Sequence, residues 1–125
     1  LTALWKELAE RYQDEPWLGG YDLINETNWD FEDSGNQNGC NCTANTPLKE
    51  IFERIIDTIR TVDNNHLVYV SGNCWGNNYR GLNSLASYDD NLSFTFHKYW
   101  NFRYRIFLLD STGAISLAIY GDKFC

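Results

Sequence analysis

Apolar positions recur every three or four residues in two stretches of the chain, and this spacing predicts two amphipathic helices. The first stretch covers residues 2–13 and is broken by Pro16. The second begins at Thr46-Pro47, which we interpret as an N-cap followed by proline at the first helical position. Residues 63–65 end this helix, and its apolar stripe consists of Leu48, Ile51, Phe52, Ile55, Ile56 and Ile59.

Three short apolar runs, at residues 21–24, 67–70 and 92–96, are typical of buried strands. The order of strand, helix and strand predicts an α/β fold with a parallel sheet covered by helices. In α/β barrels the active site lies at the carboxyl ends of the strands. We therefore expect the polar and aromatic residues that follow the three runs to gather there: Asn25, Glu26, Asn73, Trp75, His97, Tyr99 and Trp100.

Two other segments are less regular. Residues 27–46 form a long loop rich in Asn, Gly, Asp and Thr, and loops beyond about 15 residues are uncommon unless they are functional or disordered. After Trp100, residues 106–109 and 114–120 are apolar but show neither a helical period nor a convincing strand-exit motif. We assign no structure to that tail.

Composition narrows the classes of partner. The net charge of −7 and pI near 4.6 argue against nucleic acid and anionic membranes, whereas a neutral polysaccharide would not be repelled. No apolar run approaches the roughly 20 residues of a membrane span, and no signal peptide precedes the opening helical pattern. Aromatic residues make up 16% of the chain, with rings that suit either packing or sugar stacking.

The four cysteines leave more than one pairing open. Cys40 and Cys42 are too close to bridge each other, while Cys74 can reach either of them from a neighbouring loop. If the chain is oxidised, we expect Cys74 to pair with Cys40 or Cys42. A zinc site needs paired C-x₂-C spacing, and the chain has one C-x-C and two histidines, so we expect no metal site.

Four segments, taken in chain order, carry a resemblance to a known family. They are Trp5-x₃-Ala9-x-Arg11-Tyr12, Gly20-Tyr21-Asp22-Leu23-Ile24-Asn25-Glu26, Ile59-Arg60-x₂-Asp63-x₂-His66-Leu67-Val68-Tyr69-Val70 and Phe96-His97-Lys98-Tyr99-Trp100. Over about residues 4–101 the chain resembles glycoside hydrolase family five, the cellulase family. Thr27 departs mildly from the proline that often follows Asn-Glu in that family.

The resemblance implies a fragment of a (β/α)8 TIM barrel, running from about the third helix to the sixth strand. A complete barrel takes about 250 residues, so the chain would supply about half of one. Residues 1–101 would then be a partial catalytic domain. Residues 102–125 are an unassigned tail, for which truncation, misjoined exons and a shifted reading frame all remain open.

The resemblance also implies roles for single residues. Glu26 stands where the family has its acid/base catalyst, and Asn25 where an asparagine binds the sugar 2-hydroxyl. His97 and Tyr99 match a pair that lines the cleft, and Trp75 resembles a sugar-stacking platform. Trp29, Trp75 and Trp100 each fit packing and sugar stacking equally well. His66, at a helix-to-strand junction, is interpreted as structural.

The family's nucleophile has no counterpart that we identify. A retaining glycosidase needs two carboxyl groups about 5–5.5 Å apart, and the chain has no glutamate after Glu53. Asp110 follows an apolar run, but too few residues separate it from His97 for a crossover of at least about 10–12 residues plus its strands. We therefore expect these 125 residues alone to be inactive.

The function implied is a secreted, cofactor-independent endo-β-1,4-glucanase that acts on β-glucan polysaccharide or oligosaccharide by a retaining mechanism, with no obligate protein partner. Two alternatives stay open. One is a non-catalytic carbohydrate-binding remnant that keeps the aromatic cleft, and the other is a sibling activity such as mannanase or β-1,3-glucanase. A glutamate downstream in the parent reading frame would favour hydrolysis.

Overall fold

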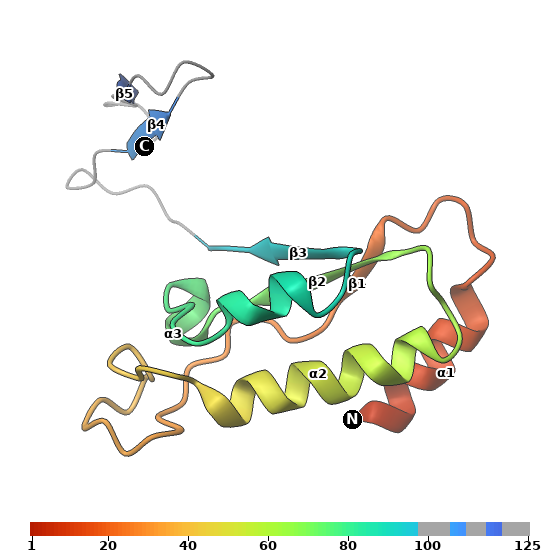
Figure 1. Ribbon diagram of the computed structural model, residues 1–125, viewed down its shortest axis with the longest axis horizontal. Helices are drawn as coiled ribbons and strands as arrows, with labels where there is room; N and C mark the ends of the chain where they lie inside the picture. The colour runs from red at the N-terminus through yellow and green to blue at the C-terminus, as the bar shows by residue number, and fades with distance from the viewer. Residues whose placement is uncertain (98–105, 110–114, 119–125) are drawn as a thin grey trace, which may run out of the picture.

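A parallel three-stranded sheet forms the centre of the computed structural model, which describes residues 1–97, 106–109 and 115–118. The strands are β1 (Gly20–Asp22), β2 (Leu67–Ser71) and β3 (Leu92–Thr95), in the order β1-β2-β3. Gly20 pairs with Leu67, and Val68 pairs with Leu92. Figure 1 shows the sheet above α2 (Thr46–Arg60), as the predicted α/β arrangement requires.

Both predicted helices are present. α1 (Thr2–Tyr12) packs against α2, and the two contribute Ala9 and the apolar stripe of α2 to one core. The predicted N-cap at Thr46 is wrong, because Thr46 is already helical and Asn45 precedes the helix with a left-handed backbone (φ 48°). The Asn45 side chain makes no capping bond and instead donates to the carbonyl of Arg80.

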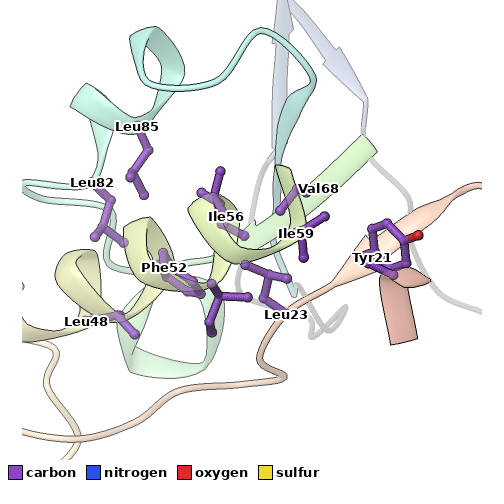
Figure 2. Packing of buried hydrophobic residues seen from close by; sticks show 12 residues of the cluster. Tyr21, Leu23, Leu48, Phe52, Ile56, Ile59, Val68, Leu82 and Leu85 are labelled. Atoms are coloured by element: carbon purple, nitrogen blue, oxygen red, sulfur yellow. The ribbon is translucent and has the colours of Figure 1, made fainter. Parts of the chain in front are cut away.

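The core lies between α2 and the sheet (Figure 2). Five buried side chains of α2 pack with Val68 and Val70 of β2, and they are Leu48, Phe52, Ile55, Ile56 and Ile59. Leu82 and Leu85 complete this core from the connection between β2 and β3, which contains α3 (Asn73–Gly76) and the 3-10 helix η1 (Asn83–Ser87). Each such burial contributes about 1.5–3 kcal/mol, so these two leucines help to hold the connection against the core.

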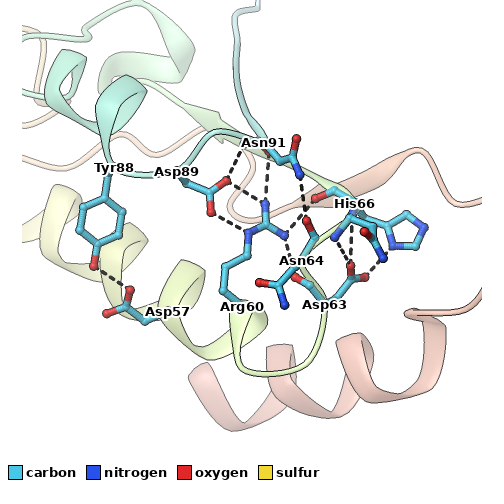
Figure 3. Close-up of polar contacts among 9 residues, drawn as sticks. Asp57, Arg60, Asp63, Asn64, His66, Tyr88, Asp89 and Asn91 are labelled. Carbon is cyan, nitrogen blue, oxygen red and sulfur yellow. Dashed lines mark hydrogen bonds and ion pairs between the residues drawn. The ribbon is translucent and has the colours of Figure 1, made fainter.

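Arg60 ties the end of α2 to the segment before β3, at the amino ends of the strands (Figure 3). Its guanidinium donates two hydrogen bonds to Asp89, at 2.6 and 2.9 Å, and two more to the carbonyls of Asp63 and His66. The hydrogen bonds from Arg60 hold the pKa of Asp89 below its ordinary value. This fork fixes where β3 enters the sheet.

Asp63 is the centre of a buried network at the same end. Its carboxylate accepts hydrogen bonds from the Tyr21 hydroxyl at 2.6 Å and from the backbone N–H groups of Asn65 and His66, and it lies 2.6 Å from the His66 ring. Burial alone would raise the pKa of Asp63, but these hydrogen bonds outweigh it and lower the pKa from 3.8 to about 2. His66 is thus structural, as its junction position predicted.

The tail contains two strands that the sequence did not reveal. β4 (Ile106–Leu109) pairs with β5 (Ile115–Ala118) in an antiparallel sheet, with Ile106 opposite Ala118. No helix among the described residues is both long and apolar enough to cross a bilayer.

The Asp63→Ala variant should lose about 3 kcal/mol or more of unfolding free energy at pH 7, because a buried hydroxyl, two N–H groups and a ring nitrogen lose their acceptor. Asp57 is the matched control, since it accepts a 2.7 Å bond from the Tyr88 hydroxyl at the surface. Asp57→Ala should cost under about 1 kcal/mol. Urea denaturation measures both, and equal losses would contradict a special role for Asp63.

The deficit of Asp63→Ala should depend on pH. The pKa of Asp63 is lowered in the fold, so its contribution is complete above pH 3.8 and is lost as the pH falls through about 2. The wild-type and variant stabilities should therefore converge between about pH 4 and pH 2. A gap that stays constant over this range would show that the carboxylate charge is not what stabilises the fold.

Candidate active site

Glu26 and His97 meet at the carboxyl end of the sheet. Their side chains are 2.7 Å apart, from Oε1 of Glu26 to Nδ1 of His97, and each is a little under a third exposed. Glu26 follows β1 and His97 follows β3, so the contact joins the two outer strands across the end of β2. Two strand spacings of about 4.8 Å separate those outer strands, and the two side chains close that gap.

The backbone at Glu26 has an unusual conformation that must be held in place. Its φ is 49°, in the left-handed region, which costs a residue other than glycine about 1–3 kcal/mol. The next residue is fixed by a 3.0 Å bond from the N–H of Trp75 to the carbonyl of Thr27. The surrounding turn therefore stabilises the direction in which the Glu26 carboxyl leaves the strand.

That turn is α3, and it contacts both segments of the site. Trp75 reaches the Glu26 segment through Thr27, while Gly76 lies against the backbone of His97. A Cβ on Gly76 would stand 3.2 Å from the His97 nitrogen, and its φ of 73° is one that glycine accepts freely. α3 therefore works as a spacer between the segments that carry Glu26 and His97.

Asn73, the first residue of α3, is fully buried and bonds the loop that follows β1. Its amide nitrogen donates to the carbonyl of Trp29 at 2.7 Å and to the side-chain oxygen of Asn45 at 2.8 Å. Its amide oxygen accepts from the N–H groups of Trp29 and Cys74, at 3.1 and 2.8 Å. Asn78 makes a similar link by donating to the carbonyls of Gly39 and Cys42. We call the three buried residues Asn45, Asn73 and Asn78 the asparagine cluster.

A disulfide joins the same two loops. Cys40 pairs with Cys74, which confirms the prediction that Cys74 bridges to Cys40 or Cys42 and identifies Cys40 as the partner. Cys42 remains a buried free thiol whose pKa is raised, chiefly by burial. The long loop at residues 27–46 is therefore anchored by a covalent bond as well as by the asparagine cluster.

The carboxylates of Asp30 and Glu32, in the same loop, accept hydrogen bonds from its backbone. Asp30 accepts bonds from the N–H groups of Ser34 and Gly35, and the bond from Ser34 contributes most to lowering its pKa to about 2. Glu32 accepts from the N–H groups of Thr43 and Ala44, which likewise lowers its pKa. Both groups shape the loop that leads away from Glu26.

The other predicted site residues lie either at the surface or outside the described residues. Asn25 is exposed directly before Glu26, and Trp75 is partly exposed on α3. Tyr99, Trp100 and Asp110 lie outside the described residues. Within residues 1–97 and the two short strands, no three His, Cys, Asp or Glu side chains are grouped as metal ligands.

Sequence reasoning missed the structural part of the site. Asn45 and Asn78 were not singled out, because asparagine is common in loops and nothing in its spacing marks a buried amide. The glycine at position 39 is a residue whose type reflects this packing, since its φ is 69° and a Cβ there would stand 2.3 Å from the Trp29 carbonyl.

A family model described as Cellulase (glycosyl hydrolase family 5) matches residues 1–111. A β-xylosidase from Phanerodontia chrysosporium is 25% identical over 96 residues, which are 77% of this chain and 17% of the relative. The chain therefore spans about a sixth of that relative.

Two solved structures of Thermotoga maritima Cel5A are similar in fold, one described as an endoglucanase and the other as a complex with cellobiose. Each gives a TM-score of 0.53 at 23% identity and covers 78% of this chain and 28% of its own. This likeness confirms the predicted fold, a piece of a (β/α)8 barrel.

Removing the disulfide should destabilise the fold by about 2–4 kcal/mol, because the bridge closes a loop with a sequence separation of 34. We expect Cys40→Ser to show this loss in urea denaturation without reductant. Cys42→Ser is the control, and like the wild type it keeps the bridge, so it should lose stability when dithiothreitol is added while Cys40→Ser should not. Peptide mapping of the wild type that finds Cys42 bridged to Cys74 would contradict the observed pairing.

Proposed function

The chain belongs to the cellulase family, glycosyl hydrolase family 5, as its motifs predicted, and from this premise we propose that it carries the acid/base half of a retaining endo-β-1,4-glucanase site. The observation that supports this proposal most is the 2.7 Å contact between Glu26 and His97. A carboxyl group at the carboxyl end of a parallel sheet, with a ring nitrogen in hydrogen-bond reach, suits proton transfer.

In the proposed reaction Glu26 first protonates the oxygen of the leaving sugar. After a glycosyl-enzyme intermediate has formed, the same carboxylate takes a proton from the attacking water. His97 orients the carboxyl group through its Nδ1 contact, and Asn25 holds the sugar 2-hydroxyl. We propose that Tyr99 contributes to sugar binding, as the family resemblance implies, and that Trp75 offers its partly exposed ring to a sugar.

A retaining mechanism also needs a second carboxylate, the nucleophile. We propose a glutamate on a later strand of the barrel, about 5–5.5 Å from the Glu26 carboxyl group. Because that group has no counterpart among the residues we assign, the 125 residues alone should not turn over β-glucan. Residues 1–101 form the partial catalytic domain in this proposal, and the family match continues to residue 111.

The substrate class is proposed as β-1,4-glucan or its oligosaccharides, and we propose an extracellular location. The fold similarity to a Thermotoga maritima Cel5A structure with cellobiose supports the sugar, and the Cys40–Cys74 bridge supports an oxidising compartment. A second candidate is a xylosidase activity, which the relative named β-xylosidase favours. Comparing kcat/KM on cellotetraose and xylotetraose separates the two.

The Glu26→Ala variant of the whole protein should lose most activity on cellulose, whose poor leaving group needs the proton. Aryl glycosides with good leaving groups need little acid assistance, so their first step should survive while the second step stalls. Azide needs no general base, and it should restore turnover and give a glycosyl azide of retained configuration. The measurement is product analysis together with burst kinetics.

Glu50→Ala is the matched control, because Glu50 is exposed on α2, and its activity should equal that of the wild type. A glycosyl azide of inverted configuration would make Glu26 the nucleophile and overturn its proposed role. Unchanged cellulose hydrolysis by Glu26→Ala would reject the proposed function altogether.

A further inference from the structure

Trp29 combines an exposed ring with a firmly held backbone. Its side chain is 66% exposed, although burying an aromatic ring of this size would be favourable. Its N–H donates to the amide oxygen of Asn73, and its carbonyl accepts from the amide nitrogen of the same side chain. The buried Asn73 amide thus fixes both backbone polar groups of Trp29, whose ring stays in solvent.

The support for Trp29 extends beyond Asn73. The Asn73 amide also bonds Asn45, whose own amide donates to the carbonyl of Arg80. Gly39 packs so closely on the Trp29 carbonyl that no side chain fits between them. The entropy of ordering this backbone is therefore lost on folding, and a ligand that meets the indole has no such cost left to overcome.

Trp17 shows that exposure alone does not bring this support. It is 92% exposed and precedes β1, at the opposite end of that strand from Glu26. Among the described residues, its N–H donates to the exposed Glu15 carboxylate, two residues away in sequence. The two tryptophans therefore share an exposed indole and differ in position and in how they are held.

Trp29 also lies close to the proposed acid/base. It follows Glu26 by three residues, so at most about 11 Å separates their Cα atoms. Thr27, which lies between them, is held by the N–H of Trp75 on α3. An oligosaccharide bound at Glu26 can therefore extend to the Trp29 ring.

The surroundings of Trp29 suit a neutral ligand with an apolar face. The next two acidic residues, Asp30 and Glu32, direct their carboxylates at backbone N–H groups of the loop. The net charge of −7 disfavours an anionic ligand. A β-linked pyranose ring fits, because its C–H groups form an apolar face and its equatorial hydroxyls point sideways.

We propose that Trp29 is a preorganised sugar-binding platform, which stacks a pyranose ring of the β-glucan chain beside Glu26 and is positioned by Asn73. This inference rests on the proposed function and adds a specific residue to its substrate site. Asn73 is a positioning residue here, since it acts on the sugar only through the indole it holds.

The test measures cellotetraose binding to the whole protein by titration calorimetry, in a Glu26→Gln background that prevents turnover. Trp29→Ala should raise the Kd about tenfold, and Trp29→Phe, which keeps a smaller ring, should raise it less. Trp17→Ala is the matched control and should leave the Kd unchanged. A Kd for Trp29→Ala within twofold of the parent, or an equal loss in Trp17→Ala, would overturn the proposal.

A second measurement follows sugar binding in the Glu26→Gln protein itself and uses Trp29→Phe only to assign one signal. In the Glu26→Gln protein, the indole N–H signal that is absent from Trp29→Phe should shift when cellotetraose is added. An unmoved signal, with other signals shifting, places the sugar elsewhere and rejects the platform. Failure of the proposed function is a different result, namely normal cellulose hydrolysis by Glu26→Ala. The binding measurements on Trp29 do not depend on that result.

Discussion

The arrangement of the candidate site depends on the need of one buried amide for hydrogen-bond partners. Asn73 has no contact with water, and its side chain makes all four hydrogen bonds that an amide can make. Each bond left unmade would cost about 1–3 kcal/mol. The loop after β1 must therefore lie against α3, and that placement brings Thr27 to Trp75 and Glu26 towards His97.

The two ends of the sheet are stabilised by different chemistry. At the amino end, ionised groups dominate, with Arg60 bound to Asp89 and a buried carboxylate at Asp63. At the carboxyl end, the bonds that fix α3 join neutral amides and backbone groups. The core of α2 and β2 lies between these ends. The ionised groups at the amino end stabilise the entry of the strands. The neutral amides at the carboxyl end fix the loops around Glu26 without adding ion pairs to α3.

Much of the fold follows from patterns in the sequence, because burial imposes a period on it. The apolar stripes at residues 2–13 and on α2 predicted the two helices, and the three apolar runs predicted the parallel sheet and the meeting of Glu26 with His97. Local propensity misled at Thr46, where contacts of Asn45 with distant residues decide how the helix begins. The asparagine cluster could not be predicted, since loop asparagines look alike until the fold buries some of them. The Cys74 pairing was narrowed to two thiols by loop adjacency.

The spacing of Cys40 and Cys42 has a consequence for which of them pairs with Cys74. Bridging Cys74 to either thiol closes a loop of nearly the same length, and closure entropy varies only slowly with loop length. Chain statistics therefore do not discriminate between these two bridges in an unfolded chain. In the folded protein Cys42 is buried and its carbonyl accepts a hydrogen bond from Asn78, which leaves Cys40 to pair with Cys74. The packing of the folded loop, rather than the length of the closed loop, therefore distinguishes Cys40 from Cys42.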